Sequence, residues 1–181
     1  MPGALVSAGD RVALRTVEPE DDPFLQRLSA NPELRVPMGT PLRSRAELEA
    51  ALEEQDDGED RFAVTLESDP VPGQPDGVEM VGSVSVSDAD WRRPELTYWL
   101  VPTIQGEGYG RESVALAIDY AFRTYDHPGV EAKAYDFNDA SRGLLESLGF
   151  EREGRLRNRR FVGGEYVDVI WYGLAREDWR G

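Results

Sequence analysis

Stretches in which apolar and polar residues alternate recur along most of the chain, and they predict a β-rich fold. Alternation with a period of two is typical of strands that bury one face. Such stretches occur at 12–16, 62–66, 80–86, 95–101, 130–135, 150–156 and 166–174. In the fourth of them, Leu96, Tyr98 and Leu100 share one face. The pattern therefore predicts a sheet of seven strands.

Other segments carry apolar residues at the spacing of an amphipathic helix. They lie at 20–30, 44–57, 110–125 and 140–148. Ser44 and Glu47 match a capping box at the start of the second segment, and Asn138 can cap the fourth. Hairpins mixed with β-α-β units predict an α/β (α+β) architecture, in which a single mixed sheet carries helices on its faces.

Charge and length narrow the class of protein. A chain of 181 residues suits one domain, so we expect residues 1–181 to form a single domain. The net charge of −15 argues against nucleic-acid and anionic-membrane partners, because both attract clustered basic surface. The acidic excess, with Lys133 as the only lysine, favours a halophilic protein whose surface charges are screened at high salt. An acidic mesophilic protein is the alternative.

Cysteine and histidine usage excludes several chemistries. The chain has no cysteine, which excludes disulfides, cysteine-ligated metals and a thiolate nucleophile. The single histidine, His127, lies in the turn sequence Asp126–Gly129, so we expect a loop histidine and no metal site. No apolar run approaches the length of about 18 residues that a membrane span needs, and the N-terminus lacks a signal-peptide pattern. These features predict a cytoplasmic protein.

The segment Gln105–Gly110 is the most informative for function. Its glycines, at 106, 108 and 110, connect a predicted strand to a predicted helix. Glycine lets the backbone approach a ligand closely, and the following helix adds the positive end of its dipole. The turn therefore suits a phosphate or pyrophosphate, with a plain strand–helix connection as the alternative. A Walker loop is excluded because no Gly-Lys-Ser/Thr follows, and the glycine spacing fits a dinucleotide fingerprint poorly.

The same turn resembles the Q/R-x-x-G-x-G/A motif of the GNAT superfamily of acyl-CoA-dependent N-acetyltransferases. The segments 95–100, 138–141, 144–154 and 164–168 are similar to the branch of this superfamily that acetylates the N-termini of ribosomal proteins. The resemblance covers residues 10–179. It implies a strongly twisted mixed sheet of six or seven strands, split into a V and flanked by about four helices.

The resemblance also implies that acetyl-CoA is the cosubstrate, and it indicates where the cosubstrate binds. Main-chain groups of Leu100 and Val101 would contact the pantetheine arm, and Asn138 would contact the cofactor near that arm. The pyrophosphate would lie on the turn and on the start of the following helix. The residues concerned are Gln105, Gly106, Glu107, Gly108, Tyr109, Gly110 and Arg111.

Acetyl transfer to an amine needs a base for the amine proton and an acid for the departing thiolate. Glu95 is the candidate base because it occupies the acidic position of the resembling strand, with an exposed strand-end glutamate as the alternative. Many members of the superfamily use as acid a tyrosine four residues before the glycine of a Gly-Phe pair, but Leu145 holds that position here. Ser141 matches the serine of the ribosomal branch and is the candidate acid, with helix capping as the alternative.

These residues predict direct transfer of an acetyl group from acetyl-CoA to the α-amino group of a protein or peptide. A small amine, such as a polyamine, amino acid or aminoglycoside, is the alternative acceptor, and a non-catalytic acyl-CoA-binding module is the alternative class. A strongly acidic acceptor cleft would favour cationic acceptors. Arg157, Arg159 and Arg160 either attract an acidic peptide or balance local acids, and we favour balance. Pairing through the last strands would give a homodimer.

Overall fold

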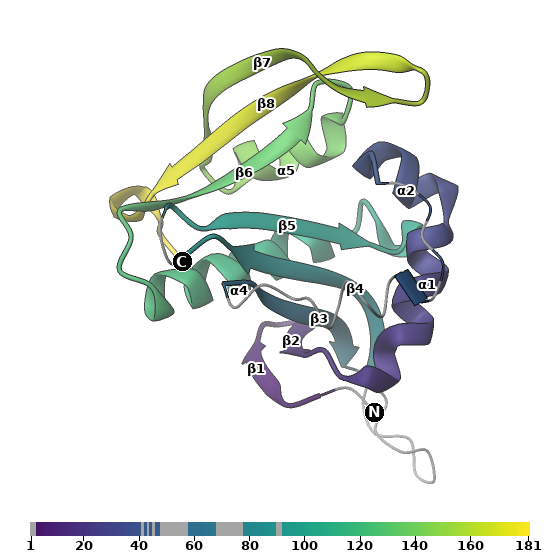
Figure 1. The fold of residues 1–181 in the computed structure, drawn as a ribbon. Coiled ribbons are helices and arrows are strands. Elements are labelled where there is room, and N and C mark those ends of the chain that lie inside the picture. The colour runs from purple at the N-terminus through teal and green to yellow at the C-terminus, as the bar shows by residue number, and fades with distance from the viewer. Residues whose placement is uncertain are drawn as a thin grey trace, which may run out of the picture.

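The strands form one mixed eight-stranded sheet. The computed structural model describes residues 3–40, 42, 44, 46–47, 58–67, 78–89 and 92–181. Its strands are β1 (Leu5–Ala8), β2 (Val12–Thr16), β3 (Asp60–Glu67), β4 (Val78–Ser87), β5 (Glu95–Leu100), β6 (Gly129–Tyr135), β7 (Glu151–Val162) and β8 (Glu165–Ala175). They lie in the order β1-β2-β3-β4-β5-β6-β8-β7 (Figure 1). All neighbours are antiparallel except β5 and β6.

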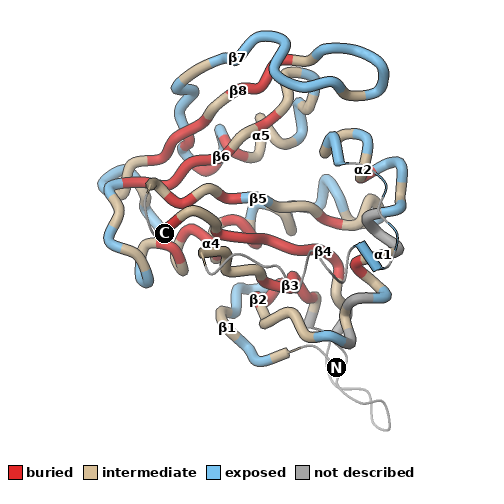
Figure 2. Tube along the Cα trace, in the orientation of Figure 1, coloured by how far each residue is buried: buried red, intermediate tan, exposed pale blue. Residues whose placement is uncertain are grey.

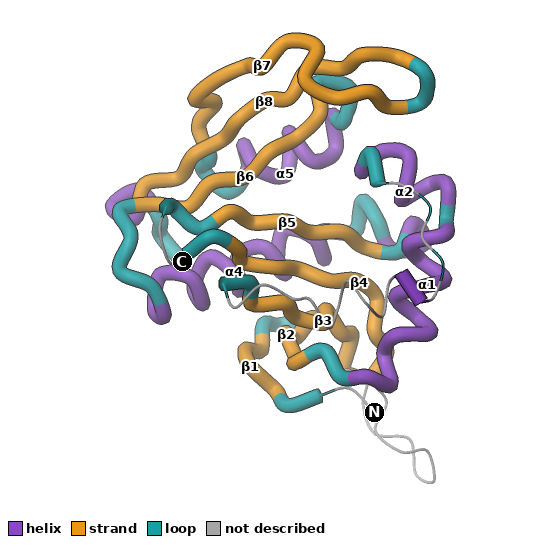
Figure 3. The backbone as a smooth tube through the Cα atoms, viewed as in Figure 1, coloured by secondary structure: helices purple, strands orange, loops and turns teal. Residues whose placement is uncertain are grey.

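Helices flank this sheet. They are α1 (Asp22–Ala30), α2 (Pro32–Met38), α4 (Tyr109–Thr124) and α5 (Asp139–Ser147). Figure 3 shows α4 and α5 behind the strands, and α1 with α2 beside the end of β5 at which that strand leads toward α4. No helix within the described ranges is long and apolar enough to cross a membrane.

The predicted fold class is confirmed, with two additional elements. All seven predicted strands are present, and β1 adds a short edge strand before them. The additional helix is α2, which begins at the Asn31 cap and ends at Gly39, whose φ of 63° is left-handed. Helix propensity alone does not predict α2, because Pro37 lies inside it and proline is disfavoured in helix interiors. Asn31, Pro32 and Gly39 are the start and stop signals that reveal it.

The predicted capping box at Ser44 is also present. The Ser44 N–H donates to Glu47 Oε2 at 2.7 Å, and the Glu47 N–H donates to Ser44 Oγ at 3.3 Å. The apolar stripe expected after it, Leu48, Ala51 and Leu52, lies outside the described residues. The box therefore stands as a local feature that the serine and glutamate spacing determines by itself.

The core lies between α4 and the sheet. Val114 and Ile118 of α4 are fully buried, as are Leu14 of β2 and Val84 of β4. Figure 2 shows buried residues concentrated along β2 to β6 and β8, whereas β7 at the sheet edge is mostly exposed. Burial of one such aliphatic side chain contributes about 1.5 to 3 kcal/mol to folding. The packed face of α4 thereby fixes its N-terminus against the end of β5.

The sheet divides between β5 and β6. The parallel pairing of these strands joins only Glu95 to Glu131 and Leu96 to Ala132. Past these residues β5 and β6 diverge, as the two ribbons in Figure 1 show. A strand that leaves its neighbour exposes side chains and main-chain groups that can bind a ligand. The V that the family resemblance implied is therefore present, at the place where the functional site is expected.

The net charge of −15 leads to a first prediction, that stability depends on salt. Self-repulsion of the acidic surface destabilises the folded chain in dilute buffer, and screening relieves it. We expect the melting temperature, followed by circular dichroism, to rise from dilute buffer to molar KCl. Potassium sulfate at equal ionic strength is the control. It screens charges to the same extent but also stabilises the fold through exclusion of sulfate from the surface, so the difference in melting temperature between the two salts measures the part that is not screening. Equal melting temperatures in dilute buffer and molar KCl would contradict the halophilic interpretation.

Candidate active site

Two cavities open where β5 and β6 diverge. The glycine-turn cavity, named for Gly106 and Gly108 in its lining, has a volume of about 500 Å³. The arginine cavity, named for Arg92, Arg159 and Arg160, has a volume of about 490 Å³ and lies among β5, β6, β7 and β8. Both volumes fall within the range of small-molecule sites. The residues that line both cavities are Pro37, Met38, Tyr98, Asn138 and Ser141.

The glycine turn presents unpaired main-chain donors at the start of α4. Gly106 and Gly108 have φ of 84° and 87°, which only glycine adopts without strain. Gly108 is the N-cap of α4, and no side chain caps this helix end. The first N–H groups of a helix have no partner within the helix, and its dipole attracts an anion to them. The turn therefore has the donors and the open backbone that a pyrophosphate requires.

Arg11 and Glu112 brace the outer side of this turn. Arg11 Nη1 donates to the carbonyl oxygen of Glu107 at 2.9 Å, and Arg11 Nε donates to Glu112 Oε2 at 3.0 Å. The Arg11 guanidinium also lies over the Tyr109 ring, 4.7 Å from its centroid. Burial alone would raise the pKa of Glu112, but bonds from the N–H groups of Arg11 and Val12 and from the guanidinium lower it overall. The ionised carboxylate thus ties the turn to the start of β2.

Most of the predicted cofactor residues share the glycine-turn cavity. Its lining includes Leu100, Gln105, Gly106, Gly108, Gly110, Arg111 and Asn138. The Gln105 side chain donates to the Leu100 carbonyl oxygen at 2.9 Å, which links the end of β5 to the turn. Val101 uses its own main chain within the fold, because its N–H donates to Val81 and its carbonyl accepts from Ile104. Contact of each residue with CoA stays a prediction.

Tyr98 and Ser141 form a hydroxyl pair at the junction of the two cavities. Tyr98 Oη and Ser141 Oγ lie 2.7 Å apart, which is a normal hydrogen-bond distance between two hydroxyls. Burial raises the pKa of Tyr98 to about 12, although the bond to Ser141 opposes the rise. The phenol therefore keeps its proton at neutral pH. Asn138 holds the serine in place, since Asn138 Oδ1 accepts from the Ser141 N–H at 3.1 Å.

No sequence pattern assigns Tyr98 a chemical role, because its face of the strand is otherwise apolar. A tyrosine between two buried leucines satisfies a core pattern equally well. Leu145, at the position of the usual acid, is fully buried in α5. The hydroxyl that faces the cavities comes instead from β5, and only the tertiary fold brings it to Ser141 of α5.

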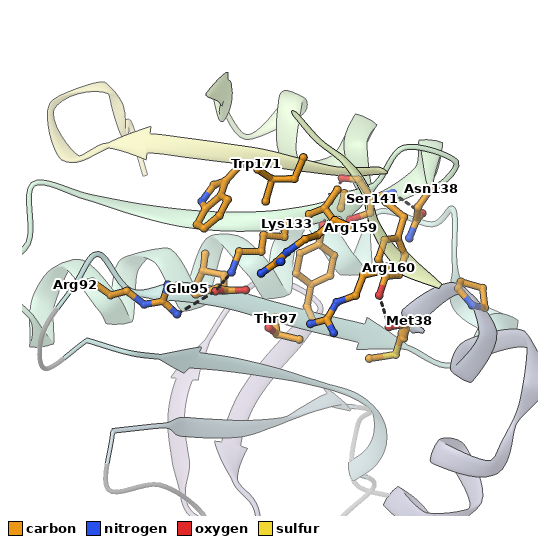
Figure 4. A pocket seen from close by; sticks show the side chains of 17 residues that line it. Met38, Arg92, Glu95, Thr97, Lys133, Asn138, Ser141, Arg159, Arg160 and Trp171 are labelled. Carbon is orange, nitrogen blue, oxygen red and sulfur yellow. Dashed lines mark hydrogen bonds and ion pairs between the residues drawn. The ribbon is translucent and has the colours of Figure 1, made fainter. Parts of the chain in front are cut away.

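Glu95 lines the arginine cavity and is bonded to the only lysine of the chain. Lys133 Nζ donates to Glu95 Oε2, and Lys133 also lies over the Trp171 ring at 4.3 Å from its centroid (Figure 4). Arg92 approaches the same oxygen at 3.6 Å. All ion pairs of Glu95 with described residues use Oε2, so Oε1 can accept from an amine or a water molecule.

The charge of the arginine cavity differs from that of the whole chain. Among the described residues of its lining, Glu95 is the one carboxylate, against the cations Arg92, Lys133, Arg159 and Arg160. The described lining of this cavity is therefore not the acidic acceptor cleft that would favour cationic acceptors. Net charge describes long-range behaviour and does not fix the sign of one cavity.

A split sheet with an anion-binding helix start on one side and a polar cavity on the other defines an acyl-CoA-dependent transferase. The family model for the acetyltransferase (GNAT) domain matches residues 11–151. The SPbeta prophage-derived uncharacterized N-acetyltransferase YokL of Bacillus subtilis is 28% identical over 180 residues, which cover 94% of this chain and 93% of the relative.

Two further similarities concern proteins with named substrates. A ribosomal protein uS5-alanine N-acetyltransferase of Escherichia coli is 30% identical, with 58% of this chain and 56% of the relative covered. Spermidine N-acetyltransferase from Vibrio cholerae, solved with CoA and spermine, has a TM-score of 0.81 at 24% identity. That match covers 94% of this chain and 98% of the other.

The chain belongs to the GNAT acetyltransferase family. It is an acetyl-CoA-dependent N-acyltransferase with acetyl-CoA as its cosubstrate. The expected resemblance and enzyme class are therefore confirmed, and the alternative of a non-catalytic binding module is not supported. The acceptor amine is left open by these similarities, because the relatives named above act on different amines.

Proposed function

We propose that this enzyme transfers the acetyl group of acetyl-CoA to the α-amino group of a protein or peptide. The observation that carries the proposal is the Tyr98–Ser141 hydroxyl pair in the wall shared by two cavities. Acetyl-CoA would bind in the glycine-turn cavity and the amine in the arginine cavity. The thioester and the amine would then meet at the hydroxyl pair. Holding two reactants in this way removes much of the entropic barrier to their reaction.

Glu95 is the proposed base. Glu95 and Tyr98 are three positions apart on β5, which corresponds to about 10 Å along a strand. Because Glu95 and Tyr98 also belong to alternate faces of β5, we expect water to relay the amine proton to the carboxylate. The amine nitrogen then forms its bond to the acetyl carbon as the carbon–sulfur bond of the thioester breaks.

Ser141 is the proposed acid. Its hydroxyl donates a proton to the sulfur that leaves, Tyr98 replaces that proton through their 2.7 Å hydrogen bond, and the phenolate formed on Tyr98 takes a proton back from water. Because burial keeps the pKa of Tyr98 at about 12, the phenol stays protonated and available throughout the neutral range. A hydroxyl pair of this kind supplies one proton at the thioester without a charged side chain.

Glu95→Gln tests the base. The amide keeps the size of the side chain and its oxygen can still accept from Lys133, but it cannot take a proton. We expect kcat to fall about 100-fold or more, within the range for loss of a general base, with acetyl-CoA affinity unchanged. Glu153→Gln is the matched control, because Glu153 is also a strand glutamate paired with an arginine, Arg93, and lines neither cavity. Wild-type turnover in Glu95→Gln would leave Glu95 a structural partner of Lys133.

The acceptor is tested by a screen in two steps. Calorimetric titration with acetyl-CoA and with CoA, in molar KCl, establishes cosubstrate binding to the folded enzyme. Thiol release is then measured with peptides that carry a free α-amino group, with polyamines and with aminoglycosides. Faster release with peptides supports the proposal, and release with polyamines or aminoglycosides alone overturns it in favour of a small-amine acceptor.

Two further points belong to this proposal. We infer that residues 1–181 act as one domain, since one sheet contains strands from β1 to β8. A homodimer through the last strands stays a prediction, for which β7 offers the sheet edge. Sedimentation of the enzyme with and without CoA measures that state directly.

A further inference from the structure

An irregular segment of β7 faces the arginine cavity. Leu156 pairs with Val169 and Arg160 pairs with Val167, so the three residues 157–159 of β7 stand opposite Asp168 alone. Asn158 in this bulge has a left-handed φ of 50°. A bulge bends its strand and redirects the side chains next to it. Figure 4 shows Arg159 and Arg160 pointing from β7 into the cavity, beside Lys133 and Thr97.

The buried carboxylate of Asp168 holds the bulge in this shape. Asp168 Oδ1 accepts from the Asn158 N–H at 2.7 Å, and Asp168 Oδ2 accepts from Arg155 Nε. The Asn158 N–H, followed by the Arg155 guanidinium, lowers the pKa of Asp168. Arg155 also approaches Asp136 at 3.6 Å. The bulge therefore has a defined conformation, fixed by contacts outside the cavity.

Arg92 and Lys133 are balanced by carboxylates of the protein itself. Arg92 pairs with Asp88 and approaches Glu131 at 3.7 Å. Lys133 pairs with Glu95. The attraction of each cation for an outside anion is reduced by these neighbours, because each anion would compete with a fixed carboxylate.

Arg159 and Arg160 have no such balance. Throughout the described part of the chain, neither guanidinium makes a hydrogen bond or an ion pair. Both side chains line the cavity, and both residues are exposed. The expectation that these arginines balance local acids is therefore wrong for Arg159 and Arg160. It holds for Arg157, whose charge contributes to lowering the pKa of Asp168.

We propose that Arg159 and Arg160 bind a carboxylate of the acceptor and thereby select amines that carry a carboxylate close to the reacting nitrogen. The inference rests on the proposed transfer to an amine in the arginine cavity. A guanidinium presents paired N–H donors that match a carboxylate, and an unbalanced pair attracts it further. The carboxylate belongs either to an acidic side chain near a peptide N-terminus or to a free amino acid. A polyamine would instead place ammonium groups beside two uncompensated guanidiniums.

The test compares short C-terminally amidated peptides that begin with alanine and carry glutamate, glutamine or lysine at the next positions. Free glutamate and spermidine are further acceptors. The measurement is kcat/KM by thiol release, at the lowest KCl concentration at which circular dichroism shows the folded chain. We expect the glutamate peptide to exceed the glutamine peptide about tenfold, which corresponds to about 1.4 kcal/mol. Added KCl should reduce this ratio, because the Debye length shortens from about 10 Å at 0.1 M to about 3 Å at 1 M.

Charge reversal at the two arginines tests their role. In the double variant Arg159→Glu, Arg160→Glu, we expect the glutamate peptide to have a lower kcat/KM than the glutamine peptide. The lysine peptide should have the highest kcat/KM of the three, with acetyl-CoA affinity unchanged. Arg152→Glu is the matched control, because Arg152 is an exposed arginine of the same strand that lines neither cavity, and it should keep the wild-type ratio. Asp168→Asn, which loosens the bulge, should lower the ratio while binding of acetyl-CoA persists.

The outcomes separate this inference from the proposed function. Equal rates with glutamate and glutamine peptides in the wild-type enzyme, or a double variant with an unchanged ratio, would overturn the carboxylate site while α-amino transfer stands. If the enzyme acetylates free glutamate but none of the peptides, the carboxylate site is supported and the peptide acceptor is overturned. Turnover of spermidine alone, with acetyl-CoA still bound, would overturn both.

Discussion

Replacement of Gly108 by valine is expected to weaken acetyl-CoA binding by more than about 2 kcal/mol, which is about 30-fold in Kd. Two causes add. A β-branched residue at the Gly108 φ of 87° is strained, and its Cβ would lie 3.1 Å from Arg11 Nη2, one of the groups that brace the turn. The valine also occupies the space where the main chain must approach the pyrophosphate. Calorimetric titration with acetyl-CoA and CoA measures the loss.

Gly164→Val is the matched control for this variant. Gly164 has a φ of 97°, and no atom lies within 4 Å of the position of an added Cβ. Valine at this position therefore introduces similar backbone strain in the β7–β8 turn, outside both cavities. Retained acetyl-CoA binding in Gly164→Val, with a lower melting temperature, would show that strain alone does not cause the effect. Unchanged affinity in a folded Gly108→Val enzyme would remove the cofactor from the glycine turn.

Ser141→Ala is expected to spare acetyl-CoA binding and to slow turnover by about 10 to 1000-fold, because the leaving sulfur loses its proton donor. Ser147→Ala is the matched control in the same helix. Ser147 Oγ donates to the Leu144 carbonyl oxygen at 2.7 Å, and the residue is exposed and lines neither cavity. Single-turnover kinetics separate the acetyl transfer step from product release. Turnover at the wild-type rate would return Ser141 to a purely structural role at the start of α5.

The Tyr98 hydroxyl is tested in the same experiment. Tyr98→Phe removes the 2.7 Å bond to Ser141 Oγ, and we expect a rate loss comparable with that of Ser141→Ala. If the two hydroxyls act in one proton path, the double variant is no slower than the slower single variant, which is the pattern of residues that act as a unit. Tyr120→Phe is the control, since the Tyr120 hydroxyl donates to Asp60 outside both cavities. If the rate loss of the double variant equals the product of the two single losses, the two hydroxyls do not share one proton path.

The high pKa of Tyr98 also determines a pH dependence. The folded pKa of about 12 lies above the ordinary value of 10.0, so the folded state favours the protonated phenol. The contribution of this group to stability is present below pH 10 and is lost as the pH rises toward 12. For the same reason, ionisation of Tyr98 does not limit turnover in the neutral range.

The charge of the arginine cavity bears on the similarity to a polyamine enzyme. The Vibrio cholerae structure holds CoA and spermine, and its likeness to this chain at 24% identity concerns the fold. The same fold can serve different acceptors, because an edge strand can change its side chains without disturbing the core. Arg159 and Arg160 lie on such an edge strand.

The sequence by itself determined most of the elements, and it predicted the residues of the cofactor half of the site. Period-two alternation marks a strand whatever its neighbours, and the helical spacing in α4 likewise depends on residues close in the chain. The glycines at 106 and 108 indicated an anion-binding turn because their effect on the backbone is local. The Ser44–Glu47 capping box is local in the same sense and was found for that reason.

Only the tertiary structure decided the acceptor half. Tyr98 meets Ser141 across 43 positions of the chain, and no local pattern encodes that distance. The sign of the net charge in the arginine cavity depends on which charged side chains are already paired. Arg155 and Asp168 neutralise one another, whereas Arg159 and Arg160, a few residues away, are left facing the cavity by a bulge in β7. Because charges interact through space, composition fixed their number and only folding decided which of them an acceptor can meet.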